Sequence, residues 1–179
     1  MTSLVARARS FAIEAHSAIN HKRKYTGDDY IVHPAEVAAI VATVPHTDEM
    51  LAAAWLHDTV EDTGVTIETI REEFGPIVAG LVADLTDVST PSLGNRAIRK
   101  GIDLAHTASA SPSAKTIKLA DLLSNTASIV AHDPGFARVY LKEKAAMLEV
   151  MTDGDATLLA RAKATLAASL AKLNGGLDK

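Results

Sequence analysis

The chain of 179 residues contains no cysteine, which excludes disulfides and thiolate metal sites. Any metal site in this chain must therefore use histidine, aspartate or glutamate. Aromatic residues make up only 4% of the sequence, and β-branched residues form only short runs. Alanine, in contrast, dominates a hydrophobic fraction of 47%. Because alanine and leucine are strong helix formers, the composition predicts an all-α protein.

The chain also has no excess of basic residues, because it contains 18 Lys and Arg and 22 Asp and Glu, which give a net charge of −4. Domains that coat nucleic acid are usually basic, so no nucleic-acid polymer is expected as a partner. No stretch reaches the roughly 18–20 apolar residues that cross a bilayer, and the N-terminus lacks the apolar core of a signal peptide. We therefore expect no membrane partner and a cytoplasmic protein. The sequence leaves a monomer and a homodimer both open.

Apolar residues recur at helical spacing along most of the chain, and short loops rich in glycine, proline or polar residues separate these segments. The pattern predicts one domain over residues 1–179, folded as a single bundle of about ten helices. The expected core covers residues 4–151, a C-terminal helix follows at 156–173, and 174–179 form a frayed tail. The other expected helices span residues 4–20, 33–44, 48–63, 66–74, 76–85, 95–108, 111–130 and 136–151.

The segment Trp55–Asp62 places four ionisable residues within an apolar run: His57, Asp58, Glu61 and Asp62. Burying such groups is costly unless they are paired or bind a metal. Residues four apart share one face of a helix, so a continuous helix sets His57 over Glu61 and Asp58 over Asp62. The segment therefore predicts metal ligands beside candidate proton acceptors.

Two further positions resemble this segment. His33 precedes a proline at the start of a helix, and Asp121 interrupts an apolar helix face, with Asn125 one turn later. With His57 and Asp58 they form the pattern H…HD…D, which is typical of HD metal-dependent phosphohydrolases. Two imidazoles and two carboxylates suit manganese, iron, cobalt, nickel or zinc better than magnesium or calcium. The remaining histidines are expected to be structural or surface residues: His16, His21, His46, His106 and His132.

The chain resembles the hydrolase domain of the RelA/SpoT family, especially its stand-alone small alarmone hydrolases. Three segments carry the resemblance: Arg23–Pro34, Ala54–Thr63 and Ile117–Asn125. The Glu-Asp pair at 61 and 62 is more specific than the H…HD…D pattern, because many other HD enzymes lack it. It favours 3′-pyrophosphohydrolases over HD phosphodiesterases.

The resemblance implies an HD domain that hydrolyses the 3′-pyrophosphate of ppGpp and pppGpp, releasing pyrophosphate and GDP or GTP. One Mn²⁺ is implied as cofactor, with the metal ligands His33, His57, Asp58 and Asp121. Glu61 and Asp62 would orient or deprotonate the attacking water. The resemblance also implies nucleotide contacts from Tyr25, Thr26, Tyr30 and Asn125. A strongly anionic substrate further calls for cations, for which the candidates are Lys22, Arg23, Lys24, Arg99, Lys118 and Arg138. Arg96, Lys100 and Lys115 are further candidates, although together with Arg99 they fit a solvated helix face equally well.

The sequence departs from the family at two positions. Lys24 stands where many relatives carry an arginine that stacks on the base, and lysine stacks less well. The adenosine alarmones (p)ppApp therefore remain open as substrates. Asp29 replaces the usual proline and adds a negative charge near the phosphate-binding loop.

Three functions besides alarmone hydrolysis are compatible with this sequence: removal of the 2′-phosphate of NADPH, nucleotide sensing without turnover, and a purely structural role for the helices. The complete ligand set and the Glu-Asp pair argue against the sensor.

Overall fold

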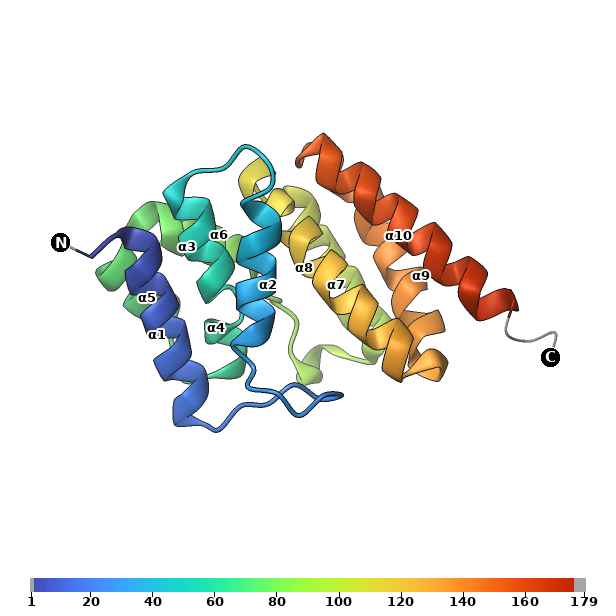
Figure 1. Ribbon diagram of the computed structural model, residues 1–179, viewed down its shortest axis with the longest axis horizontal. Coiled ribbons are helices and arrows are strands. Elements are labelled where there is room, and N and C mark those ends of the chain that lie inside the picture. The colour runs from blue at the N-terminus through green and yellow to red at the C-terminus, as the bar shows by residue number, and fades with distance from the viewer. Residues whose placement is uncertain (1, 176–179) are drawn as a thin grey trace.

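The computed structural model describes residues 2–175, which contain ten α-helices, one short 3-10 helix and no strand. The predicted all-α bundle of about ten helices is thus confirmed (Figure 1). The helices are α1 (Leu4–Ala18), α2 (Val32–Val41), α3 (Asp48–Leu56), α4 (Thr59–Asp62), α5 (Ile67–Phe74), α6 (Pro76–Leu85), η1 (Pro91–Leu93), α7 (Arg96–Ser109), α8 (Pro112–His132), α9 (Pro134–Val150) and α10 (Ala156–Gly175). Of the expected tail, residues 174 and 175 continue α10, and 176–179 lie outside the described residues.

Helix α8 runs through the middle of the bundle and contacts α2, α3, α6, α9 and α10. Twelve of its 21 residues are buried. A helix surrounded in this way is expected to be apolar on almost every side, so its buried polar residues call for a separate reason. Helices α1, α3, α5 and α6 lie at one end of the molecule, and α9 and α10 lie at the other (Figure 1).

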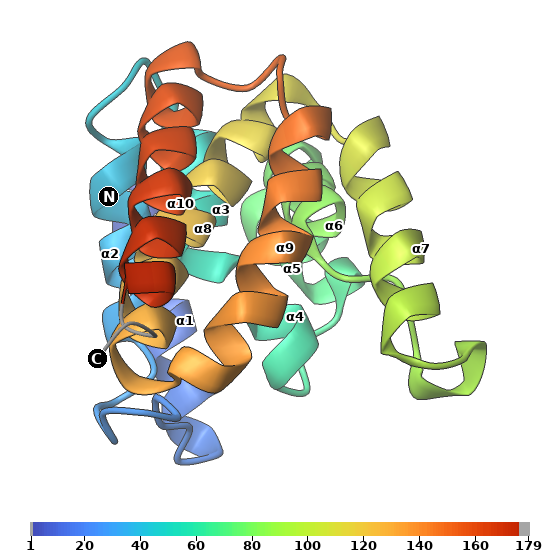
Figure 2. The ribbon, with the colours of Figure 1, turned by 90° about the vertical axis from the view of Figure 1, so that its right-hand side faces the viewer.

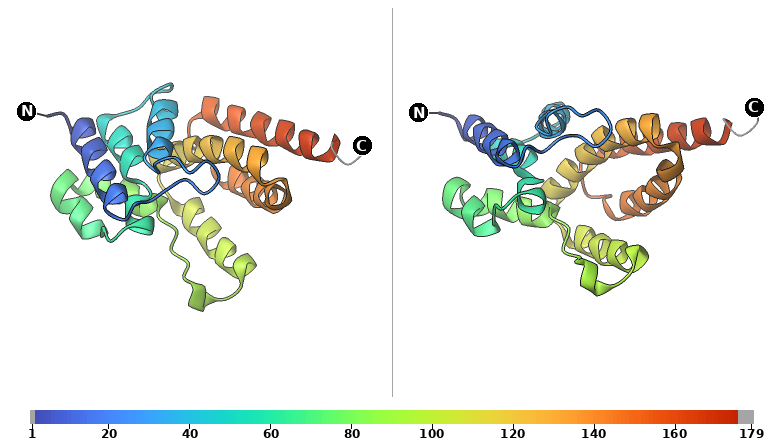
Figure 3. Two further views of the ribbon diagram at one scale, coloured as in Figure 1. Left: turned by 60° about the horizontal axis from the view of Figure 1, so that its bottom comes forward. Right: turned by 90° about the horizontal axis from the view of Figure 1, so that it is seen from below.

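Helix α7 stands somewhat apart from the other helices. It is joined to α6 by an extended segment and projects away from the N-terminal helices (Figure 3). Its main neighbour is α9, which lies between α10 and α7 (Figure 2). Among the described helices, none combines the length and the apolarity that a bilayer crossing requires.

Side-chain caps explain most helix starts. Ser3, Thr47, Thr66, Asn95 and Ser111 each accept a hydrogen bond from the backbone N–H three residues later, as N-caps do. A side-chain cap also explains why one predicted helix boundary was wrong. Helix α9 begins at residue 134, two residues earlier than predicted, because Asp133 caps it and a proline occupies its first turn.

The expected helix over residues 48–63 is interrupted, which corrects the prediction. Helix α3 ends at Leu56 and α4 begins at Thr59. The His57 Nδ1 lies 2.9 Å from the Ala54 carbonyl oxygen, and the Thr59 hydroxyl donates to the Leu56 carbonyl at 2.7 Å. These side chains compete with backbone N–H groups for the carbonyls of the last helical turn. His57 and Asp58 therefore lie at a corner between two helices.

The loop between α9 and α10 approaches α8 closely at Gly154. A β-carbon there would lie 3.1 Å from Leu119 Cδ1 and 3.3 Å from the backbone carbonyl carbon of Lys115. We expect Gly154→Val to lower the free energy of unfolding by about 1–3 kcal/mol, the usual cost of overpacking. Urea denaturation measures this change.

A second glycine provides a control of opposite sign. Gly80 lies in α6, is exposed, and a β-carbon added there meets nothing within 4 Å. We expect Gly80→Ala to raise the free energy of unfolding by about 0.4–1 kcal/mol. Equal stability of Gly154→Val and the parent would show that the loop yields to the added volume.

Candidate metal centre and its cavity

Four side chains from three parts of the chain converge at one buried point. His33 is in the first turn of α2, His57 and Asp58 form the corner between α3 and α4, and Asp121 lies in the middle of α8. The ligand atoms of His33, His57 and Asp58 all lie within 4.8 Å of one another. Asp121 Oδ1 lies 3.1 Å from His33 Nε2 and 3.9 Å from His57 Nε2. The structure thus brings together the four residues that the sequence predicts as ligands.

The ring nitrogens fit a metal ion. The Nε2 atoms of His33 and His57 are buried and have no hydrogen-bond partner among the described residues. Buried polar atoms rarely lack partners. Both atoms face carboxylates, with Asp58 Oδ2 at 3.5 Å from His33 Nε2 and 3.1 Å from His57 Nε2. Two unpaired nitrogens and two carboxylates form the mixed donor set of a divalent transition metal.

The electrostatics of the cluster favour a cation. Burial opposes the protonation of His57, but the carboxylates of Asp58 and Asp121 outweigh it and raise its pKa to about 9. Burial likewise opposes ionisation of Asp58, yet His57 and His33 hold the pKa of that carboxyl below its usual range. The carboxylates that draw a proton to His57 would also draw a metal ion. We therefore expect metal binding to release protons.

Two further side chains orient the carboxylate ligands. The Tyr30 hydroxyl donates to Asp58 Oδ2 at 2.6 Å, and the Asn125 amide donates to Asp121 Oδ1 at 2.6 Å. Contacts of this kind fix the direction in which a ligand points. His21 stacks on the Tyr30 ring with centroids 3.8 Å apart, and His16 is buried beside both rings. These two histidines hold Tyr30 in place.

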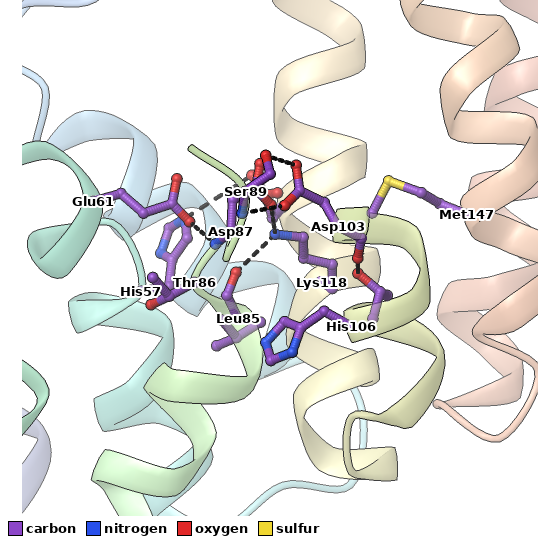
Figure 4. Close-up of polar contacts among 12 residues, drawn as sticks. His57, Glu61, Leu85, Thr86, Asp87, Ser89, Asp103, His106, Lys118 and Met147 are labelled. Carbon is purple, nitrogen blue, oxygen red and sulfur yellow. Dashed lines mark hydrogen bonds and ion pairs between the residues drawn. The ribbon is translucent and has the colours of Figure 1, made fainter. Parts of the chain in front are cut away.

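Glu61 and Asp62 lie on the short helix α4, next to the ligand corner. Glu61 Oε1 accepts a hydrogen bond from the backbone N–H of Asp87 at 2.6 Å (Figure 4). Desolvation, followed by the charges of Asp87 and Asp58, raises the pKa of Glu61 to about 7, although the hydrogen bond from the Asp87 N–H and the charge of Lys118 oppose the shift. Desolvation and the charge of Asp58 also raise the pKa of Asp62. Both carboxyls are thus better proton acceptors than an ordinary surface acid.

A cavity of about 700 Å³ opens beside the metal centre. Seven carboxylates line it: Asp58, Glu61, Asp62 and Asp121, which belong to or adjoin the ligand cluster, and also Asp87, Asp103 and Glu143. Five cations also line it: Arg96, Lys100, Lys118, Lys142 and Lys144. Aromatic and apolar side chains complete the wall, among them Phe136, Tyr140, Val139 and Met147. The cavity therefore joins a site for a metal cation to a surface suited to a polyanion with a flat ring.

Several of these cations have acidic partners. Lys118 donates to the Leu85 carbonyl at 2.9 Å and lies 3.9 Å from Asp87 Oδ1 (Figure 4). Lys100 donates to Asp87 at 2.7 Å and to Asp103 at 3.3 Å. Lys144 instead contacts the Met147 sulfur at 3.2 Å, and burial lowers its pKa.

The predicted substrate residues fall into three groups. Tyr30, Lys118 and Asn125 line the cavity. Arg23 does not line it but donates to Asn125 Oδ1 at 3.2 Å. The other four residues predicted from the loop at 22–26 are absent from the cavity wall that residues 2–175 form: Lys22, Lys24, Tyr25 and Thr26.

The loop residues contact one another and the residue that caps α9, Asp133. Lys22 forms an ion pair with Asp29, and their backbones form an antiparallel bridge. Asp29 therefore closes the loop through both its side chain and its backbone. The Tyr25 hydroxyl donates to Asp133 at 3.0 Å, and the Lys24 ammonium lies 4.8 Å from the Tyr25 ring centroid. The Thr26 hydroxyl accepts from the backbone N–H of Asp28.

Two predicted cations lie away from the cavity wall. Arg138 donates to the Leu173 carbonyl at 2.7 Å and to Asn174 at 3.2 Å, against the last turns of α10. Arg99 Nε is buried, has no hydrogen-bond partner among the described residues and lies outside the lining of the cavity. Arg96 and Lys100, on the same helix as Arg99, reach the cavity instead.

Sequence reasoning also missed the contribution of α9. Phe136, Tyr140 and Lys144 recur every four residues and share one helix face that lines the cavity. Two of them belong to the few aromatic residues of the chain. That spacing was the signal that the sequence offered. It is equally typical of a helix face that packs into the core, and only the position of α9 beside α7 and α8 distinguishes the two.

Comparison with known proteins shows the family to which the chain belongs. The HD domain family matches residues 8–171, and the chain belongs to this family. A probable GTP pyrophosphokinase of Mycobacterium leprae (strain TN) is 42% identical over 124 residues. The guanosine-3′,5′-bis(diphosphate) 3′-pyrophosphohydrolase MESH1 of Danio rerio is 40% identical over 127 residues, which cover 69% of this chain and 68% of the relative.

A solved structure also matches, from a metazoan ortholog of SpoT reported to hydrolyse ppGpp. The TM-score is 0.82 at 27% identity, covering 94% of this chain and 96% of that one. The predicted resemblance to RelA/SpoT-type hydrolases is thereby confirmed. The matched part of this chain spans 69% of its own length but only 15% of the length of the mycobacterial relative. The same share is 18% for a relative from Aquifex aeolicus (strain VF5).

Proposed function

We propose that this protein hydrolyses the 3′-pyrophosphate of the guanosine alarmones ppGpp and pppGpp, releasing pyrophosphate and GDP or GTP. The observation that carries the proposal is the position of the ligand quartet. Asp58 and Asp121 line a cavity that also holds Glu61, Asp62 and five cations, and the Nε2 atoms of His33 and His57 lie 3.1 Å from these two carboxylates. Relatives of similar length carry the name of this activity.

The cavity suits a nucleotide with two diphosphate groups. Its volume of about 700 Å³ falls within the range of small-molecule sites, roughly 300–1,000 Å³. Cations from α7, α8 and α9 would neutralise phosphate charge that the metal does not reach. Phe136 and Tyr140 offer flat apolar surfaces for a base or ribose. Of the predicted contacts, Asn125 and Tyr30 lie nearest the ligands and would contact the reacting end.

The two residue groups around the metal would divide the chemistry. A divalent ion held by the four ligands would supply Lewis acidity, which makes water more acidic and offsets charge on phosphoryl oxygens. Glu61 and Asp62 would accept the proton of the attacking water and orient it toward the phosphorus on the ribose 3′-oxygen. As the bond between that phosphorus and the ribose 3′-oxygen breaks, Lys118, near Asp87, would stabilise the charge on the leaving 3′-oxygen. We propose Mn²⁺ as the native ion and the cytoplasm as the place of action.

A turnover assay tests the proposal. The purified protein with Mn²⁺ is given ppGpp, ppApp and NADPH side by side, and pyrophosphate and phosphate are measured separately. We expect pyrophosphate from ppGpp. Pyrophosphate from ppApp alone would replace the guanosine substrate with an adenosine one. Phosphate from NADPH alone would indicate 2′-phosphate removal, and no turnover on any substrate would contradict the proposal.

A further inference from the structure

The two histidine ligands are anchored differently. The His57 Nδ1 lies 2.9 Å from the backbone carbonyl oxygen of Ala54, a group that can only accept. The His33 Nδ1 lies 2.9 Å from the hydroxyl of Ser124, a group that can either donate or accept. Which ring nitrogen of neutral His33 carries the proton therefore depends on where the Ser124 hydroxyl directs its single proton.

Glu36 determines that direction. It lies one turn after His33 in α2, and its Oε2 accepts from the Ser124 hydroxyl at 2.7 Å. An ionised carboxylate offers no proton, so the hydroxyl must donate to Glu36 and present its lone pair to His33. The Nδ1 of His33 then carries the proton, and Nε2 is left with a lone pair. That buried Nε2 faces Asp58 and Asp121.

The opposite arrangement would impair the site. If Ser124 donated to Nδ1, the neutral ring would carry its proton on Nε2, between the two carboxylate ligands. Nε2 lies only 3.1 Å from Asp121 Oδ1, so the carboxylate would attract that proton and hold it on Nε2. A metal would have to displace this proton before binding. Ser124 is 8% exposed and His33 is 1% exposed, so water has little access to compensate.

We propose that Glu36 and Ser124 are positioning residues that set the tautomer of His33 for metal binding. The inference rests on the proposed metal site and assigns a function to two residues outside the ligand set. Glu36 acts through Ser124, and neither touches the substrate cavity as lined by the described residues. Removing a partner of this kind typically weakens metal binding by about 10- to 100-fold.

The test is Mn²⁺ affinity measured by isothermal titration calorimetry without substrate. We expect Glu36→Ala and Ser124→Ala to weaken binding by about 10- to 100-fold. Glu36→Gln should stay near the parent value, because its amide oxygen still accepts the Ser124 proton. Ser128→Ala is the matched control, one turn later on α8, and should bind like the parent. Glu36 is exposed, so its substitution leaves the core intact, and circular dichroism verifies the helix content of each variant.

The outcomes separate this inference from the proposed function. Parent-like affinity in Glu36→Ala would overturn it, as would equal losses in Glu36→Ala and Glu36→Gln, which would indicate a simple charge effect. Weakened binding in Glu36→Ala and Ser124→Ala, rescued in Glu36→Gln, would support it even if the parent protein hydrolysed no alarmone. That last result would contradict only the proposed function.

Discussion

Asp121→Ala is expected to abolish tight metal binding and to lower alarmone hydrolysis by on the order of 10³-fold or more. The Asp121 carboxylate lies beside both histidine nitrogens, at 3.1 and 3.9 Å. Metal ions contribute several kcal/mol of charge stabilisation in the transition state, and each 1.36 kcal/mol corresponds to about tenfold in rate. Mn²⁺ titration and pyrophosphate release, measured on the same samples, test both parts of the prediction.

Two further variants isolate the role of the Asp121 charge. Asp121→Asn keeps the size of the side chain and removes only its charge, so it should lose metal affinity with the helix content unchanged. Asp48→Ala removes an exposed carboxylate at the start of α3, far along the helix from His57, and should retain the parent rate. Retained Mn²⁺-dependent turnover in Asp121→Ala would mean that the ligand set is incorrectly assigned.

Glu61→Gln is expected to keep its metal and to lose about 10²-fold or more of the rate, the usual scale for a lost general base. Glutamine preserves the acceptor for the Asp87 N–H, which lies 2.6 Å from Glu61 Oε1, so the local backbone should not move. The measurement is kcat for ppGpp with Mn²⁺ at saturation. A rate close to that of the parent would transfer the acceptor role to Asp62.

The pH profile provides a second test of Glu61. Its pKa is raised to about 7 by desolvation and by the neighbouring Asp87 and Asp58, and only the carboxylate form accepts a proton. The rate should therefore rise with pH through about 7, and at pH 6 it should be roughly a tenth of its plateau. Glu61→Gln should lack this limb. If the limb persists unchanged in Glu61→Gln, another group is titrating.

The sequence was sufficient for features that depend on local rules. Caps such as Thr47 and Ser111 mark helix starts. Ionisable residues within apolar runs, together with the H…HD…D pattern that adds His33, predicted the four side chains that converge. The break at His57 was not predictable, because it depends on side chains that compete for backbone carbonyls at the end of α3. Periodicity alone favours one continuous helix there.

Long-range placement explains the other differences. Whether Arg96, Arg99 or Lys100 faces the cavity depends on the rotation of α7 relative to α9, which a residue pattern on one helix does not determine. Arg138 was expected near a phosphate, but its guanidinium contacts the last turns of α10, a helix 18 residues or more away in sequence. Neither the rotation of α7 nor the contact of Arg138 with α10 can be deduced from residues that are close in sequence.

The corner at His57 and Asp58 separates the metal ligands from the acceptor carboxylates along the chain. The ligands lie on α2, at the corner between α3 and α4, and on α8, whereas Glu61 and Asp62 lie on a four-residue helix followed by a polar loop. So short a helix contributes little stability of its own. Substitutions in residues 63–66 can therefore shift the acceptor carboxylates while the ligands stay in place. Turnover and metal affinity are thus open to separate adjustment, by evolution or by design, on the two sides of a single corner in the chain.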